Sequence, residues 1–95
     1  MTKLNINRTD DEKGGRYAVS INGDEAEMTY SRAGATRIII DHTAVPDAMR
    51  GLGVGKQLVE AAVHDARAEG FKIIPLCPFA KATLTKHDDW QDVVQ

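Results

Sequence analysis

The sequence predicts one mixed α+β domain: an antiparallel four-stranded meander, a long helix after a glycine-rich loop, a parallel fifth strand and short C-terminal helices. Three observations favour this class. The first half alternates apolar and polar residues with the period of two that strands show. Residues 58–66 carry apolar side chains at helical spacing. The chain has 95 residues, which suits a single domain, 1–95, and excludes two-domain enzymes and a full dinucleotide-binding fold.

Turn signals separate the expected strands of the first half. Leu4 and Ile6 alternate with polar neighbours in the first strand, and the polar stretch 9–15 is expected to be a loop. The second strand ends at Asn22-Gly23, a dipeptide that favours a two-residue hairpin turn because both residues tolerate positive φ. A third strand follows this turn, so the first half is predicted to be a meander.

The fourth strand, 37–45, contains a β-branched run, 38–40, that ignores alternation and favours a central strand covered on both faces. The long helix ends at Gly70, a common helix stop. Residues 71–74 form the next strand. Because a helix separates it from the fourth strand, the two are expected to be parallel neighbours.

The C-terminal region is expected to hold a weaker helix, 79–86, and a short final turn. Asp88, with Gln91 three residues later, suggests that this turn is capped by side chains. Trp90 is expected to fill the core beneath the turn rather than to bind a substrate.

Composition excludes several classes of function. Fourteen acidic and twelve basic residues give a net charge of −2, which argues against a nucleic-acid-binding module. No apolar run approaches the roughly 20 residues that span a bilayer, and no signal-peptide pattern is present, so we expect a cytoplasmic protein without membrane contact. The single cysteine, Cys77, excludes an intramolecular disulfide, and the three histidines lack metal-ligand spacing, so no metal is expected.

The most informative motif is the segment Arg50-Gly51-Leu52-Gly53-Val54-Gly55-Lys56. It is no Walker loop, because three residues instead of four separate Gly51 from Gly55, and Gln57 occupies the magnesium-binding position. It is no dinucleotide fingerprint, because a single residue separates Gly53 from Gly55. The segment offers no side chain that would cap the helix, so the first N–H groups are left for an anion or for water. A pyrophosphate cradle and a solvated strand-to-helix turn both remain open.

The core of this segment, Arg50-x-x-Gly53-x-Gly55, resembles the acyl-CoA loop of the GNAT (general N-acetyltransferase) superfamily, and the expected order of strands and helix matches as well. The segments Pro75-Leu76-Cys77-Pro78-Phe79 and His42-Thr43-x-Val45-Pro46 resemble the small single-domain, GNAT-like acetyltransferases. The resemblance covers nearly the whole chain.

This resemblance implies an acetyl-CoA-dependent N-acetyltransferase, with acetyl-CoA as co-substrate and a primary amine as acceptor. The implied pyrophosphate-binding residues are Arg50, Gly51, Leu52, Gly53, Val54, Gly55 and Lys56, and those implied for the pantetheine arm are Thr43, Ala44 and Val45. The arm is expected where the fourth and fifth strands splay apart. Pro75 lacks an N–H and would end the ladder there, which is equally the behaviour of a plain strand terminator.

The resemblance also bears on the catalytic residues, because many superfamily members carry a tyrosine general acid in the helix after the fifth strand. Residues 79–87 contain none, and Thr83 and Leu84 stand in its place. Cys77 is a candidate for the general acid or the acyl carrier, or is a buried small hydrophobe. His42 is a candidate general base, or has a structural role.

The remaining histidines are expected to be structural: His87 at a helix end and His64 in solvent. The short chain leaves little material for a closed acceptor pocket, so the acceptor site is expected to be open. Such a site suits a peptide, a protein lysine or a pocket completed by a partner, with the chain monomeric or weakly dimeric. Two alternatives remain open, namely a non-catalytic acyl-CoA binding or sensing module and an anion-binding structural domain.

Overall fold

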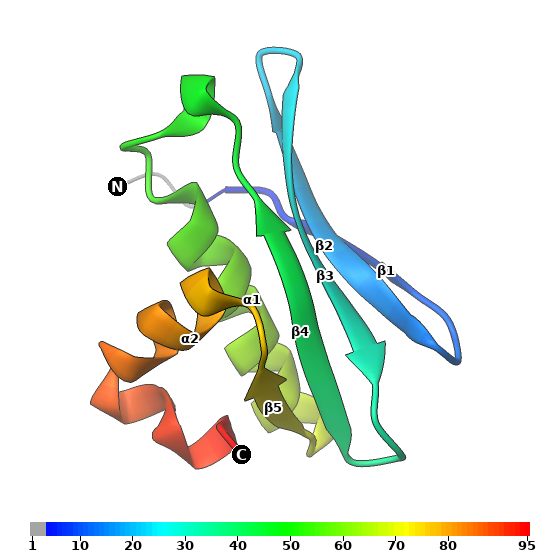
Figure 1. The fold of residues 1–95 in the computed structure, drawn as a ribbon. Coiled ribbons are helices and arrows are strands. Elements are labelled where there is room, and N and C mark those ends of the chain that lie inside the picture. Colours follow the sequence, from blue (N-terminus) through cyan, green and yellow to red (C-terminus); the bar gives the residue numbers. More distant parts are fainter. Residues whose placement is uncertain (1–3) are drawn as a thin grey trace.

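The computed structural model describes residues 4–95 as one sheet with helices packed against it (Figure 1). In chain order the elements are β1 (Asn7–Asp10), β2 (Gly14–Ile21), β3 (Asp24–Arg32), β4 (Arg37–Ala44), η1 (Asp47–Met49), α1 (Val54–Glu69), β5 (Lys72–Pro75), α2 (Pro78–Thr85) and η2 (Asp88–Val93). The strand order is β1-β2-β3-β4-β5; the first four strands pair antiparallel, and β5 pairs parallel with β4. The predicted fold class and the parallel fifth strand are confirmed.

One face of the sheet carries the core, against which α1 packs its apolar stripe. The core side chains include Tyr17, Val19, Ala26, Met28, Tyr30, Ile38, Ile40 and Ile73 from the sheet and Val54, Leu58, Val59, Ala62, Val63 and Ala66 from α1. α1, α2 and η2 contact one another, which places them on the same side of the sheet. Ile39 points to the other face and is only half-buried. The expectation that the fourth strand is covered on both faces was therefore wrong.

The N-terminal segment differs from the expected strand. β1 begins at Asn7, whereas Leu4 and Ile6 lie before it and are partly buried against the core. The Leu4 N–H donates to the side-chain oxygen of Gln57 on α1 at 2.7 Å. Apolar alternation at residues 4–6 thus reflects packing on a helix and not strand pairing.

The loop expected at 9–15 is shorter than predicted, because Thr9 and Asp10 belong to β1 and the two glycines belong to β2. Gly14 and Gly15 pair with Ser31 and Tyr30 of β3. A Cβ atom at Gly14 would lie 2.1 Å from the Tyr30 carbonyl oxygen, so this position requires glycine for close strand approach. The predicted hairpin turn at Asn22-Gly23 is confirmed, with φ values of 50° and 86°.

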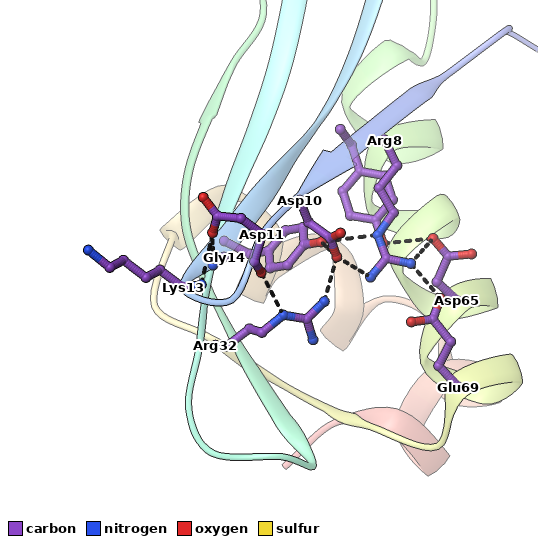
Figure 2. Close-up of polar contacts among 10 residues, drawn as sticks. Arg8, Asp10, Asp11, Lys13, Gly14, Arg32, Asp65 and Glu69 are labelled. Carbon is purple, nitrogen blue, oxygen red and sulfur yellow. Dashed lines mark hydrogen bonds and ion pairs between the residues drawn. The ribbon is translucent and has the colours of Figure 1, made fainter.

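A network of charged residues joins β1 to β3 and α1, with Arg8 at its centre (Figure 2). The Arg8 guanidinium contacts Asp10 at 3.1 Å and Asp65 at 3.2 Å, and it also contacts Glu69. The Tyr30 hydroxyl accepts from Arg8 at 3.0 Å and donates to Asp10 at 2.9 Å. The hydrogen bond from Tyr30, together with the neighbouring arginines, holds the pKa of Asp10 below its usual range. The network is therefore fully formed at neutral pH and weakens as pH falls through that lowered pKa.

The C-terminal region ends in η2, which packs Trp90 and Val93 into the core at 5% and 3% exposure. The expected side-chain cap was wrong: His87 occupies the N-cap without a side-chain hydrogen bond. The Gln91 amide donates instead to the carbonyl groups of Leu84 and His87. Gln91 therefore ties η2 to the end of α2.

Candidate functional site

The β4–β5 ladder stops halfway along β4. The last parallel pair is Ile40 with Pro75, after which the N–H groups of Leu76 and Cys77 both donate to the Ile40 carbonyl at 3.2 and 3.1 Å. β4 continues to Ala44 beyond the end of β5 (Figure 1). Within residues 4–95, this last part of β4 has a ladder partner on the β3 side alone. The backbone edge that opens toward α2 is therefore available to a ligand.

A bulge in β4 decides which side chains face this opening. The β3–β4 register shifts between Thr29 and Tyr30, after which Met28 pairs with Thr43 and Thr29 pairs with His42. Directly paired residues share a sheet face, so Thr43 lies on the helix-covered face with the buried Met28. His42 lies on the opposite, exposed face. The structure therefore brings Thr43 to the opening and leaves His42 across the sheet from it.

The N-terminus of α1 opens onto the same region. Gly51 and Gly53 adopt left-handed φ values of 83° and 72°, and Gly53 is the N-cap without a side-chain hydrogen bond. The first turn of α1 carries no acidic residue. A helix leaves its first N–H groups without intrahelical partners, and its dipole favours an anion at this end. The loop geometry thus creates an uncapped, electropositive helix start.

Gly55, in the first turn of α1, permits close packing by α2. A Cβ atom there would lie 2.4 Å from Cζ of Phe79. Phe79 is nevertheless 44% exposed, so its ring covers Gly55 with one side and presents the other to solvent. The glycine therefore lets an aromatic ring stand directly beside the helix start.

These features surround one cavity of about 530 Å³. Its lining residues are Thr43, Val45, Met49, Arg50, Gly51, Gly53, Val54, Gly55, Lys56, Phe79, Thr83, Lys86 and His87. The predicted cofactor-binding residues all belong to this set except Ala44 and Leu52, and Leu52 is 46% exposed. The structure thus gathers most of the predicted loop and strand residues around one space.

The cavity is lined by cations and by no carboxylate. Arg50, Lys56 and Lys86 contribute positive charge. Arg50 pairs with Asp47 at 3.1 Å, but both side chains are largely exposed, and such pairs are weak. Within residues 4–95, Lys56 and Lys86 make no ion pair. The cavity therefore suits a polyanionic ligand with an apolar portion.

Cys77 lies at the junction of the strand opening and α2. It is 6% exposed, forms the N-cap of α2, and donates from its thiol to the Thr43 hydroxyl at 3.5 Å. Burial raises the pKa of the thiol, but the Thr43 hydroxyl and the N–H groups of Ala80 and Phe79 outweigh this, so the pKa of Cys77 is lowered. The thiol is thus partnered with a cavity-lining residue and is more acidic than a free cysteine.

The sequence prediction missed the contribution of α2 to the cavity. Phe79, Thr83, Lys86 and His87 follow the i, i+4, i+7, i+8 spacing of one helix face, and this pattern could have identified them. The Thr83 hydroxyl donates to the Phe79 carbonyl at 2.9 Å, so its proton is used in a hydrogen bond within α2. Among residues 4–95, no cluster of His, Cys, Asp or Glu could hold a metal ion, and no helix is long and apolar enough to cross a membrane.

Comparisons with known proteins agree with this geometry. The solution structure of a GCN5-like protein from Staphylococcus aureus aligns with a TM-score of 0.75 at 39% identity, covering 100% of this chain and 91% of that one. Protein NATD1 from Xenopus tropicalis is 36% identical over 69 residues, which are 70% of this chain and 63% of that protein. Protein NATD1 from Danio rerio is 31% identical over 78 residues, 80% of this chain and 69% of that protein.

The match to the frog protein thus spans less than two thirds of that protein's length. The profile of the family described as GCN5-related N-acetyl-transferase matches residues 16–93, which include the whole cavity. The chain therefore belongs to the GCN5-related N-acetyltransferase family, a family of acetyl-transfer proteins.

Proposed function

We propose that this protein transfers the acetyl group of acetyl-CoA to a primary amine. One observation carries the proposal: a single cavity joins the uncapped start of α1 to the unpaired edge of β4, and the Cys77 thiol is bonded to Thr43 on that edge. An uncapped helix start fits a diphosphate, and an unpaired strand edge fits the amide groups of a pantetheine arm. The two features stand in the order in which CoA carries these groups.

The residues present fit the co-substrate in charge and in space. Arg50, Lys56 and the N–H groups of Gly53 to Gly55 would hold the diphosphate, and Gly51 and Leu52 set the turn that aims them. The Phe79 ring occupies the space beside Gly55, so this glycine allows α2 to pack closely against α1. The space beside Gly51, in the turn before the helix, is open. The backbone of Thr43, Ala44 and Val45 would pair with the arm.

The proposed reaction is direct attack by the amine. The nitrogen lone pair attacks the thioester carbonyl, a C–N bond forms, the C–S bond breaks, and CoA leaves as a thiolate. Cys77 donates its proton to that thiolate and is reprotonated from water, and the amine loses one proton to a base. This family member lacks the tyrosine that would otherwise donate the proton, and Cys77 is the acidic group beside the opening.

The acceptor approaches from the exposed face of the sheet. His42 lies on that face, across β4 from Thr43, so it is placed to accept a proton only from an amine that enters there. The exposed face has room for a peptide or a protein lysine, and we propose such an acceptor for a cytoplasmic protein, monomeric or weakly dimeric, whose free thiol stays reduced.

Calorimetric titration with acetyl-CoA, followed by mass spectrometry of reactions with a mixed amine library, tests the proposal. We expect binding and acetylated product together with free CoA. Binding without product above background would instead identify a non-catalytic acyl-CoA-binding module. Absence of binding would overturn both functions and leave a structural anion-binding domain.

Cys77→Ala tests the proton donor separately. We expect turnover to fall at least about tenfold while acetyl-CoA affinity stays within a factor of two, since general acid catalysis typically contributes about 100-fold or more. Turnover near that of the wild type would remove Cys77 from the mechanism. Thr85→Ala, on the exposed side of α2, is the matched control.

A further inference from the structure

Two separate walls of the cavity carry positive charge. One is the start of α1, with Arg50 and Lys56; the other is the end of α2, where Lys86 supplies the charge and the His87 imidazole lies beside it. The first wall offers backbone N–H groups as well as side chains. The second offers side chains alone, because α2 ends there and its C-cap N–H already donates to carbonyl groups of its own helix. A second wall of this kind suits a second, independent anionic group.

The imidazole of His87 is held in place by its surroundings. Its ring stacks on Trp90 with centroids 3.9 Å apart and planes inclined by 22°, and Trp90 is itself 5% exposed. The Gln91 amide donates to the His87 carbonyl at 3.1 Å, which fixes the backbone as well. An ordinary solvated helix end needs neither contact. The ring is therefore pre-oriented at the cavity wall, which lowers the entropic cost of binding.

Lys86 is the second member of this wall. A lysine at a helix C-terminus is favoured by the helix dipole alone. Lys86, however, lines the cavity and has no ion pair within residues 4–95. Lys81, one helix face away, is exposed and does not line the cavity. The two lysines therefore differ in what they face.

The position of this wall relative to Cys77 also matters. Cys77 precedes α2 and Lys86 follows it, so the helix separates them by about 13 Å at 1.5 Å per residue. The thiol thus contacts Thr43, which lines the cavity, and Lys86 and His87 line it near the opposite end of α2. A ligand with its reactive group beside Cys77 would carry its most distant anion toward Lys86 and His87.

We propose that Lys86 and His87 form a subsite for a phosphomonoester, and that this subsite binds the 3′-phosphate of the adenosine in CoA. The inference rests on the proposed function, because it assumes that CoA occupies the cavity. CoA carries a diphosphate and, separately, a 3′-phosphate, which match the two charged walls. The subsite makes the protein select CoA over 3′-dephospho-CoA.

Calorimetric titration of the full chain with CoA and with 3′-dephospho-CoA tests this selection. We expect the wild type to prefer CoA about tenfold, which is the size of one good charge-assisted contact. In the double variant Lys86→Gln/His87→Gln we expect the preference to fall below twofold, with the affinity for 3′-dephospho-CoA unchanged. Lys81→Gln, the matched control on the exposed face of α2, should keep the wild-type preference.

Several results would overturn the subsite. The first is equal affinity of the wild type for CoA and 3′-dephospho-CoA. The second is a preference for CoA that survives in the double variant. The third is an equal loss of affinity for both ligands in the double variant, which would indicate a structural role for the two residues. Lys86→Arg retains the charge and should retain the preference, which keeps the test decisive if the double variant is unstable. Failure of the wild type to bind either ligand would overturn the proposed function itself and is distinct from these outcomes.

Discussion

The two ends of α1 differ in whether their charged side chains form ion pairs. Toward its C-terminus, Asp65 and Glu69 are paired with Arg8, and the Tyr17 hydroxyl also donates to Asp65 at 2.8 Å (Figure 2). At its N-terminus, Lys56 has no ion pair within residues 4–95. Charges that are partnered inside the fold stabilise it, whereas charges left around a cavity are available to a ligand.

A second cavity underlines this difference. It measures about 490 Å³ and lies beside the Arg8 network, between α1 and the segment before β1. Its charged lining residues include Arg8 and Asp65, which are already bonded to each other. Similar volume therefore does not mean similar function. What distinguishes the two cavities is their charge, because Glu60 and Asp65 line this one, whereas no carboxylate lines the cavity at the start of α1.

The largest expected effect comes from Gly53→Val, at the start of α1. A β-branched residue disfavours the left-handed conformation at φ 72° and would turn the following N–H groups away from the cavity. We expect acetyl-CoA affinity to fall about 100-fold, the equivalent of two charge-assisted hydrogen bonds. Titration calorimetry measures this.

Gly34→Val is the matched control, since Gly34 has φ 80° in the turn between β3 and β4 and its Cβ would meet no neighbour. It should cost comparable stability and leave affinity intact. Equal affinity loss in both variants would contradict the assignment of the helix start.

The next largest effect is expected for Arg8→Met in the paired region. Removing the guanidinium leaves Asp10, Asp65 and Glu69 without their shared cation, at a cost of about 2 kcal/mol in the free energy of unfolding. Urea denaturation measures this, and acetyl-CoA affinity should not change. Arg16→Met, which removes surface pairs with Glu25 and Glu27, should have little effect on stability. Equal effects of the two variants would refute a special role for the Arg8 network.

Tyr17→Phe should have a smaller effect in the same region. The variant keeps the ring in the core and removes one hydrogen bond to Asp65. The free energy of unfolding should fall by about 1 kcal/mol, which lowers Tm by about 4–8 °C in a domain of this size. Thermal unfolding followed by circular dichroism measures it. A loss of acetyl-CoA affinity in this variant would contradict the separation of the Arg8 network from the ligand-binding cavity.

The smallest expected effect concerns the thiol of Cys77, which is hydrogen-bonded to Thr43 beside the cavity at the start of α1. The pKa of Cys77 is lowered in the folded state, so its thiolate forms at lower pH than in the unfolded chain. Thr43→Val removes the hydroxyl partner, leaves burial in place, and should move the midpoint of thiolate absorbance upward. Thr85→Val, whose hydroxyl bonds to the Lys81 carbonyl, should leave the midpoint unchanged. A downward shift in Thr43→Val would contradict the hydrogen-bond explanation.

Local patterns predicted the elements well where one physical rule dominated. Asn22-Gly23 formed its turn because few other dipeptides accept two positive φ values. Gly70 ended α1 in the left-handed conformation, and Pro75 ended the β4–β5 ladder. These residues restrict the backbone whatever their neighbours are.

Other elements depended on partners that are distant in the sequence. Gly14 and Gly15 have the composition of a loop, but they are strand residues because the β3 backbone passes too close for side chains. Leu4 and Ile6 alternate like a strand, but α1 offered them an apolar surface. The bulge in β4 sent His42 to the exposed face, and no feature of the local sequence specifies a bulge there.

The sequence by itself predicted the fold class and the glycine-rich helix start, because backbone restriction and hydrophobic period are local properties. The candidate loop and strand residues came from the resemblance of this segment to the GNAT superfamily. The tertiary structure decided which of these residues share a cavity, that α2 supplies the opposite wall, and that Cys77 meets Thr43. The physical reason is that contacts between elements are set by sheet register and helix packing. Those depend on every strand at once, and not on any one segment.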